Sequence, residues 1–324
     1  MDLNTINISV VICTYNGEKY LSAQIESVLR QSYPISEIII QDDCSTDSTW
    51  SIIETYQRMH PSLIKCFQNE HNLFWNQNFY SAIKKSSGDF IALCDQDDVW
   101  HPQKIEIQIA HIKDKMICVC CSNYWSEGVF TPMKKVETSF QTYLFYPQYS
   151  GHEMLLNKRA KEFVSVGQQI DMAHDIFFSL IGLYTSDIVI LEETLVDWRR
   201  HPTSATGYAV DDKHAMVDGK GKVLACVQSL ANRHISPVIK SGCEKYYQLF
   251  CYLKQFVGEQ DGIDWAIAMA KLLKKQTILA YLSAGFLIWK NRTLFFRVKS
   301  SFIKQIYSSF TFPFRWWYDH QFSL

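Results

Sequence analysis

A short unit of apolar strand, polar loop and amphipathic helix recurs along the N-terminal part of this chain. The run ISVVIC (8–13) ends in the loop TYNGEKY, and apolar residues at helical spacing follow over 20–32. The runs EIIIQ (37–41), IKCFQ (64–68) and FIAL (90–93) begin the units that follow. Because continuous apolar strands that alternate with helices must be buried on both faces, the pattern predicts an α/β fold, a doubly wound and mostly parallel sheet with helices on both faces.

The sequence also indicates where the helices of these units begin and end. The second helix is expected over 49–60, and it has three candidate N-cap residues: Ser45, Thr46 and Asp47. The third loop, NEHNLFWNQN (69–78), is expected to precede a helix over 79–87 that ends at Gly88.

The loops that follow the strands carry polar side chains at what must be one edge of the sheet, where ligands of such folds collect. These side chains are Thr14, Tyr15 and Asn16 after the first strand, Asp42 and Asp43 after the second, and Asp95, Asp97 and Asp98 after the fourth. Neither GxGxxG nor GxxxxGK[ST] follows any of these strands, so a glycine-rich phosphate loop is missing. A phosphate-bearing ligand would therefore need a divalent cation held by the carboxylates. Taken alone, Asp42 and Asp43 could equally be turn residues.

Composition excludes several classes of protein. With 324 residues, 47% of them hydrophobic, the chain can bury one large domain or two modest ones and is not disordered. A net charge of −1 gives no general attraction for nucleic acid. The ten cysteines lie mainly in apolar runs without paired CxxC motifs, which indicates reduced core residues in a cytoplasmic protein. The N-terminus lacks signal-peptide features, and the longest lipid-like stretch (277–289) is shorter than the ~20 residues of a spanning helix.

Two motifs resemble the inverting family 2 glycosyltransferases, which have the GT-A fold. They are SVVICTYNGEKYLSAQIESVLRQSYPISEIIIQDDCSTDST (9–49) and GDFIALCDQDDVWHPQKI (88–105), and they occur in the family's order and at its separation. The resemblance covers about the first 110 residues. The variant DQDDVW (95–100) is most similar to bacterial rhamnosyltransferase-type enzymes of surface polysaccharide assembly.

This resemblance implies roles for the acidic edge. It places Tyr15 and Asp43 against the nucleotide base, and Asp95 and Asp97 near the ribose and a metal-bound diphosphate. The cation would be Mg²⁺ or Mn²⁺, with either Asp97 or Asp98 as its direct ligand. From these loops the implied contacts to the nucleotide sugar are Thr14, Tyr15, Asn16, Asp43, Asp95 and Asp97.

A later segment, DMAHDIFFSLIGL (171–183), resembles the family's acidic motif at a helix start near the acceptor. The resemblance implies that Asp175 is the catalytic base, which takes the proton of an acceptor hydroxyl during a single inverting displacement. It places His174 and Gly151, the latter in YSGHEMLLNKRA, on the acceptor side. The alternative is that Asp175 caps the helix, a role that Asp171 could fill equally well.

The segment LVDWRRHPTSATG (195–207) is similar to the family's closing basic motif. It implies that Arg200 and His201 approach the diphosphate and stabilise its charge as it leaves. The alternative is a solvated turn before Pro202. The chain departs from the family at Phe74, where the third loop often has a glycine, and this departure puts the shape of the donor-sugar pocket in doubt.

The two parts of the chain are expected to be a catalytic domain (1–207), which binds the nucleotide sugar and the acceptor, and a helical C-terminal region (208–324). From Lys271 to Leu324 there are nine Lys or Arg and one acid, Asp319, with many aromatic residues between them. This mixture predicts peripheral contact with an anionic membrane. Packing on the catalytic domain, or a homodimer interface, is the alternative.

The sequence therefore favours a metal-dependent inverting glycosyltransferase of the hexosyltransferase type. It would move a sugar, with rhamnose as the first candidate, from a nucleotide-diphosphate donor to a growing, lipid-linked glycan of a bacterial surface. It would act in the cytoplasm at the inner face of the cell membrane, without a nucleic acid partner. The alternatives are a nucleotidyltransferase, whose usual glycine- and arginine-rich first loop is missing from TYNGEKYL, and a catalytically inactive nucleotide-sugar-binding module.

Overall fold

The computed structural model divides the chain into two compact units. The first contains residues 1–137 and 147–204, and the second contains residues 138–146 and 205–324. The residues that the structure describes are 6–126, 128–133, 139–144, 147–201, 204, 219–232, 235–260, 262–295 and 301–320. All ten cysteines are among them, and all are free thiols.

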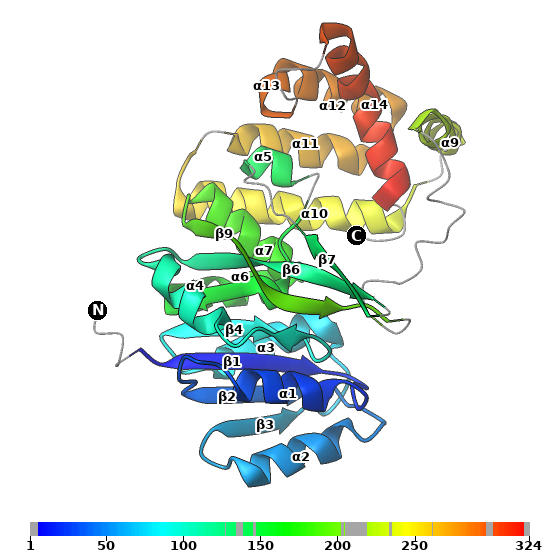
Figure 1. Ribbon diagram of the computed structural model, residues 1–324. Coiled ribbons are helices and arrows are strands. Elements are labelled where there is room, and N and C mark those ends of the chain that lie inside the picture. The colour runs from blue at the N-terminus through cyan, green and yellow to red at the C-terminus, as the bar shows by residue number, and fades with distance from the viewer. Residues whose placement is uncertain are drawn as a thin grey trace. The chain divides into compact units, whose positions relative to one another are not determined.

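A mixed sheet forms the centre of the first unit (Figure 1). Its strands are β1 (Ile8–Thr14), β2 (Glu37–Asp42), β3 (Ile64–Gln68), β4 (Phe90–Cys94), β5 (Val99–Trp100), β6 (Ile117–Ser126), β7 (Val129–Met133), β8 (Met154–Asn157) and β9 (Ile188–Arg199). Within the described residues their order is β3-β2-β1-β4-β8-β6-β9-β5, and β7 pairs with β6 outside this path.

The four N-terminal strands are parallel. β2 and β3 lie on one side of β1, and β4 lies on the other. Val10 of β1 lies opposite Ile38 of β2 on one side and opposite Ala92 of β4 on the other. The direction of winding therefore reverses between β1 and β4, and loops that leave these strands diverge around a crevice. Beyond β4 the sheet is mixed: β8 is antiparallel to β4 and β6, whereas β9 is parallel to β6.

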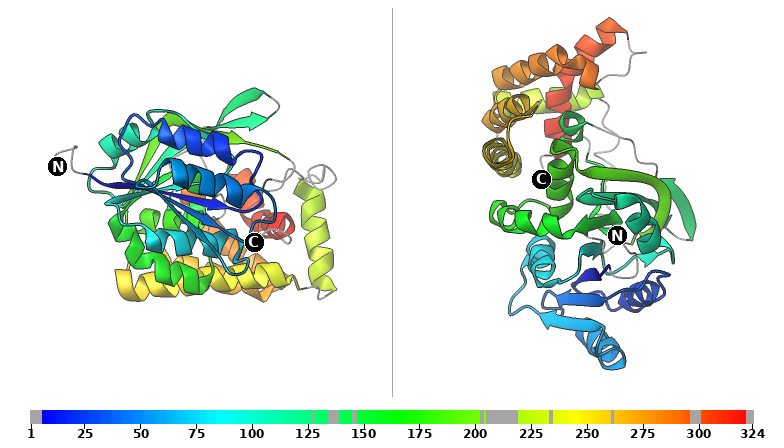
Figure 2. Two further views of the ribbon diagram at one scale, coloured as in Figure 1. Left: turned by 90° about the horizontal axis from the view of Figure 1, so that it is seen from below. Right: turned by 90° about the vertical axis from the view of Figure 1, so that its left-hand side faces the viewer.

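Helices cover both faces of this sheet, so the predicted fold class is confirmed (Figure 2). Alternate residues of β1, such as Val10 and Ile12, belong to the buried cluster formed with α1, α2 and α4. The other face, with Val11, packs against α3. The helices of this unit are α1 (Leu21–Leu29), α2 (Thr49–Met59), α3 (Phe74–Lys85), α4 (Lys104–Ile112), α6 (Lys161–Ile170) and α7 (His174–Tyr184), with short 3₁₀ turns at Gly151–Glu153 and Lys158–Ala160.

The boundaries predicted for the third strand, loop and helix of the sequence were wrong in two places. Helix α3 begins at Phe74, within the segment that was expected to be loop. Its polar residues hide the helical pattern because they face inwards: Asn78 is buried and donates to the carbonyl of Gln41 at 3.0 Å. The helix ends at Lys85 rather than at Gly88.

Gly88 instead allows a close approach to β1. A Cβ at Gly88 would lie 2.7 Å from the backbone nitrogen of Ser9, so a larger residue would push the two segments apart. The expected N-cap of α2 was also wrong by one residue or more, because Ser48 occupies that position. Asp47 still accepts a hydrogen bond from the backbone of Thr49, at 3.0 Å.

The second unit is helical in its described part, as expected for the C-terminal region. Its helices are α5 (Phe140–Tyr143), α9 (Gly219–Ala231), α10 (Pro237–Tyr252), α11 (Ile263–Lys275), α12 (Ile278–Lys290), α13 (Arg292–Phe295) and α14 (Phe302–His320), with a π-helical turn at Leu253–Val257. Helix α10 packs on α11, α11 on α12, and α12 on α14 (Figure 1). Among the described residues, no helix combines the length and hydrophobicity required to cross a bilayer.

Candidate functional site

The loops that follow β1, β2 and β4 are tied together at the carboxyl edge of the sheet. The side-chain amide of Gln96 accepts from the backbone nitrogen of Tyr15 at 2.9 Å and donates to its carbonyl at 3.0 Å. Asn16 accepts from the backbone nitrogen of Thr46 at 2.8 Å, and its own backbone nitrogen donates to Ser45 at 2.9 Å. These bonds hold the aromatic ring of Tyr15, which is 47% exposed, at the sheet edge.

The adjacent carboxylates of Asp42 and Asp43 differ in their surroundings. Asp42 is fully buried, and its oxygens accept from the hydroxyl of Thr14 at 2.8 Å, the backbone nitrogen of Ser45 at 3.0 Å and the amide of Gln68 at 3.1 Å. Asp42 therefore connects the ends of neighbouring strands. The hydroxyl of Thr14 takes part in this connection as one of the donors to Asp42. Asp43 uses Oδ1 for two bonds, one from the Asn69 side chain and one from the Leu73 backbone, each 2.7 Å long.

The acidic run after β4 has a different partner for each carboxylate. Asp95 Oδ2 lies 3.2 Å from Nδ1 of His152, and Asp97 Oδ2 lies 2.9 Å from Nε2 of His201. Asp98 is fully buried, and its Oδ1 accepts from the backbone nitrogen of Arg199 at 2.9 Å. Its Oδ2 is buried without a hydrogen-bond partner among the described residues.

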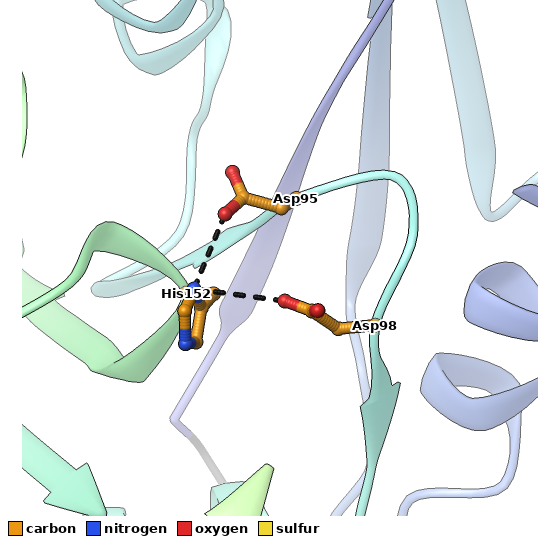
Figure 3. A group of neighbouring side chains, drawn as sticks. All are labelled: Asp95, Asp98 and His152. Atoms are coloured by element: carbon orange, nitrogen blue, oxygen red, sulfur yellow. Dashed lines mark hydrogen bonds and ion pairs between the residues drawn. The ribbon is translucent and has the colours of Figure 1, made fainter. Parts of the chain in front are cut away.

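Asp95, Asp98 and His152 form one compact group (Figure 3). Each offers an atom that can bind a metal, and these atoms lie within 4.8 Å of one another. His152 Nδ1 is 3.6 Å from Asp98, and His152 comes from the 3₁₀ turn before β8. Burial disfavours the charged imidazole, but Asp98, Asp95 and Glu153 outweigh burial and raise the pKa of His152 to about 9.

The pKa values of the three aspartates also separate. Burial would raise the pKa of Asp95, but the hydrogen bond and the charge of His152 lower it below the usual range. Burial and the neighbouring Asp95 raise the pKa of Asp97, although His201 opposes this. Burial raises the pKa of Asp98 well above its ordinary value. Of these three carboxyl groups, Asp95 therefore has the lowest pKa.

Asp175 lies in the first turn of α7, and its Oδ1 accepts from the backbone nitrogen of Ile176 at 2.7 Å. The N-cap of α7 is Ala173, and Asp171 is the C-cap of α6 in a left-handed conformation with φ 55°. Neither Asp175 nor Asp171 therefore occupies the N-cap of α7. Burial raises the pKa of Asp175, which makes its carboxylate a stronger base than an exposed one.

His174 and Gly151, both expected on the acceptor side, are in contact. The imidazole stacks on Phe79 with 4.1 Å between ring centroids and meets the edge of Trp75 at 5.7 Å. A Cβ at Gly151 would lie 2.4 Å from His174 Nε2, so this position has no room for a larger residue unless the ring moves. Burial lowers the pKa of His174, and neither ring nitrogen has a hydrogen-bond partner among the described residues.

The basic segment after β9 meets the acidic run. His201 pairs with Asp97, and its ring lies 4.5 Å from that of Tyr20. The guanidinium of Arg200 lies over Trp198, 4.5 Å from the ring centroid, and Pro202 lies outside the described residues. The expected pair is thus divided, with His201 against the acidic run and Arg200 on an aromatic ring.

Two residues of this region were missed by sequence reasoning. Arg199 donates through Nε to the carbonyl of Asp97 at 2.8 Å, and its guanidinium lies 3.8 Å from the ring centroid of Trp125. His152 follows directly after Gly151, but a single histidine in GHE has no spacing that indicates a ligand. The available signal was its position in a segment already assigned to the site.

The model of glycosyl transferase family 2 matches residues 9–170 of the chain, which is half of its length. The chain belongs to glycosyl transferase family 2. This match continues well beyond the motifs near the N-terminus and includes the turn that carries His152. The predicted family is thereby confirmed.

Two bacterial proteins that the chain resembles are sugar transferases according to their names. WfaP of Escherichia coli, a UDP-Glc:alpha-D-GlcNAc-diphosphoundecaprenol beta-1,3-glucosyltransferase, is 37% identical over 123 residues, which cover 38% of this chain and 48% of that protein. The dTDP-rhamnosyl transferase RfbG of Shigella flexneri is 28% identical over 213 residues, which cover 64% of this chain and 60% of RfbG. The chain therefore matches roughly half of the length of these relatives.

Two solved structures share the fold of this chain. The S. aureus TarS 1–349 structure in complex with UDP has a TM-score of 0.59 and 17% sequence identity, and the alignment covers 96% of this chain and 89% of that one. The complex of the same TarS segment with UDP-GlcNAc has a TM-score of 0.52 at 16% identity, over 96% of this chain and 90% of that one. These likenesses establish the GT-A architecture.

Proposed function

We propose that this family 2 chain is an inverting glycosyltransferase that moves a sugar from a nucleotide-diphosphate donor to a growing, lipid-linked bacterial surface glycan. The main support is that one unit holds two kinds of carboxylate. Those after β2 and β4 lie at the carboxyl edge of the sheet, and Asp175 begins a separate helix with a raised pKa. The name of WfaP supports a lipid-linked acceptor. The names of WfaP and RfbG together support glucose and rhamnose as candidate donor sugars.

In this proposal the donor occupies the crevice at the sheet edge. The half-exposed ring of Tyr15 stacks on the nucleotide base, and Asp43 accepts a hydrogen bond from the base. Asp95 and Asp97 lie towards the ribose and the diphosphate. Arg200 and His201 donate to the diphosphate as negative charge develops on it, because cationic donors at that point favour departure.

Asp175 acts as the general base. It removes the proton of the acceptor hydroxyl, and that oxygen forms a bond to the anomeric carbon of the donor sugar. The bond from this carbon to the diphosphate oxygen breaks on the opposite face, so the nucleotide diphosphate leaves and the configuration inverts. Burial brings the pKa of Asp175 closer to neutrality, where a carboxylate accepts a proton most effectively.

The residues present fit a divalent cation. The buried Asp98 Oδ2 has no hydrogen-bond partner among the described residues. The carboxylates, together with the imidazole of His152 once it has released its proton, provide oxygen and nitrogen donors that suit Mn²⁺ or Mg²⁺. Asp97 with His201 is a second carboxylate–imidazole group on the same edge. A bound ion would supply positive charge to the donor diphosphate.

A screen of the purified full chain against nucleotide sugars tests the proposal. The panel includes UDP-glucose and dTDP-rhamnose, because the names of the relatives contain both, with a lipid diphosphate sugar as acceptor and free nucleotide diphosphate as the readout. NMR of the product reports the anomeric configuration. A parallel assay supplies a nucleoside triphosphate and a sugar 1-phosphate, and release of pyrophosphate in it would instead indicate a nucleotidyltransferase. Donor binding without turnover of any pair would indicate an inactive binding module.

A further inference from the structure

One helix of the second unit, α12, has an apolar face towards solvent. Helix α12 packs on α11 and α14, and Trp265 of α11 donates to the carbonyl of Leu287 at 3.4 Å. The large apolar side chains exposed on α12 are Ile278, Leu279, Leu282 and Phe286, which are 36%, 76%, 43% and 51% exposed. Their spacing places them along one stripe of the helix. A surface helix normally has polar residues on this side, so the stripe requires an explanation.

The first turns of α14, the helix that packs on α12, also expose large apolar side chains. Phe302, Ile303 and Tyr307 are 58%, 79% and 51% exposed. Later in the helix, Phe314 contacts Tyr281 of α12, with 5.6 Å between ring centroids. The two helices lie side by side in Figures 1 and 2. The outer-helix surface is defined here as Ile278, Leu279, Leu282, Phe286, Phe302, Ile303 and Tyr307.

Positive charge accompanies the outer-helix surface. Lys290 ends α12 and Lys304 lies in the first turn of α14, and both are exposed. Lys275, also exposed, ends α11 just before α12 begins. The sequence contains no Asp or Glu from 271 to 318. An apolar surface with lysines on its own helices and no acid between residues 271 and 318 has the composition of a helix that lies in an anionic lipid interface.

We propose that the outer-helix surface docks the chain on an anionic lipid bilayer, a binding function that goes beyond the proposed sugar transfer. The α12 helix has 13 residues and is therefore about 20 Å long, shorter than the ~30 Å hydrocarbon layer, so it lies along the interface rather than across it. A second copy is a poorer occupant. Symmetric pairing would bring together two surfaces with cations and no acids, and isologous contacts must be self-complementary.

Vesicle sedimentation of the full chain tests this proposal. Vesicles of phosphatidylcholine and phosphatidylglycerol at three to one are compared with pure phosphatidylcholine, at low and high salt. We expect binding to the anionic vesicles that weakens at high salt without disappearing, because apolar contacts are not screened. The double variant Leu279→Gln, Phe286→Gln should bind about tenfold or more weakly. The matched control Met59→Gln, Val129→Gln replaces two apolar residues that are 62% and 65% exposed elsewhere, and it should bind normally.

A second pair of variants tests the charges. Lys290→Gln with Lys304→Gln should lower binding to the anionic vesicles by roughly tenfold and reduce its salt dependence. Lys220→Gln with Lys240→Gln removes two exposed lysines of α9 and α10 and should have little effect. Thermal unfolding verifies that each variant is folded.

Three outcomes would overturn the proposal. The first is that the folded wild type does not bind anionic vesicles. The second is that the double variant Leu279→Gln, Phe286→Gln binds them as well as the wild type does. The third is that the wild type binds no vesicles and is a dimer in light scattering, which this double variant converts to a monomer. The last result would assign the surface to a second copy. None of these measurements depends on sugar transfer, so they are independent of the proposed function.

Discussion

The aspartates at the sheet edge have the same side chain but different surroundings. Asp42 is saturated by hydrogen bonds from neighbouring strand ends. In contrast, the buried Oδ2 of Asp98 has no hydrogen-bond partner among the described residues and faces only the imidazole of His152, at 3.6 Å. Asp97 and Asp95 each face an imidazole. At the scale of single residues, the partners of each carboxylate therefore separate structural roles from candidate binding roles.

The role proposed for Asp175 predicts a kinetic effect without a binding effect. Asp175→Asn should lower the rate of the chemical step by ~10²-fold or more, because an amide cannot accept the acceptor's proton. Nucleotide binding, measured by calorimetry, should change little. Asp171→Asn is the control: this residue ends α6, and its variant should retain the rate within a few-fold. Wild-type turnover by Asp175→Asn would mean that another group is the base.

Two carboxylate–imidazole groups could hold the cation: Asp95 and Asp98 with His152, or Asp97 with His201. Each predicts a different set of variants with weaker Mn²⁺ binding. If the ion is held by the deeper group, Asp98→Asn and His152→Gln should each reduce Mn²⁺ affinity by about tenfold or more, as loss of a ligand does. If it is held by Asp97 and His201, substitution of those residues should have that effect instead. Titration calorimetry of the folded variants decides between them. Full turnover in excess EDTA would contradict metal dependence altogether.

At the scale of elements, the loop after β1 depends on the loop after β4. Gly17→Ala should disturb both, because the new Cβ would lie 2.2 Å from Gln96 Oε1 and displace the amide that holds Tyr15. We expect nucleotide affinity to fall roughly five- to tenfold, the scale of one or two lost hydrogen bonds, with little loss of stability. Gln96→Ala should have a similar effect. The double variant Gly17→Ala, Gln96→Ala should then bind nucleotide no more weakly than Gln96→Ala alone. Additive losses of affinity would show that the two loops act independently.

The strands and the acidic edge could be predicted because each depends on a local pattern. The runs 8–13 and 90–93 are apolar, and the polar residues after them lie at the carboxyl ends of parallel strands. The partners of these residues could not be predicted in the same way. Arg199 reaches Asp98 across about a hundred positions because β9 pairs with β5, and the start of α3 is hidden by inward-facing asparagines such as Asn78.

At the scale of the whole molecule, Glu37 connects three parts of the first unit. Its buried carboxylate accepts from Ser9 of β1, from Lys65 of β3 and from the backbone of Ser87 before β4. Burial opposes its ionised form, but these donors outweigh burial and lower its pKa to about 2. Because the folded-state pKa is depressed, Glu37 contributes stability above its ordinary pKa of 4.5, and this contribution is lost as the pH falls towards 2.

Glu37→Gln should therefore destabilise the protein by on the order of 1.5–3 kcal/mol at pH 7, the usual contribution of hydrogen bonds to a buried charged group. The difference from the wild type should decrease between pH 5 and pH 3. Urea unfolding across that range measures it, and Glu54→Gln on the exposed side of α2 is the control. A constant difference at all pH values would show that shape, rather than charge, is what Glu37 provides.

The position of β9 also affects the order in which the first unit can form. The last of the described strands in the sequence is not added at a free edge of the sheet, because it pairs with β6 on one side and with β5 on the other. The two-residue β5 directly follows the acidic run, so that run gains its C-terminal support when β9 arrives. On the ribosome, the strands before it can pair while the chain is still growing. In the proposed function, residues near 200 complete the diphosphate end of the crevice, so a nascent chain could not bind the donor fully before that segment has left the ribosome.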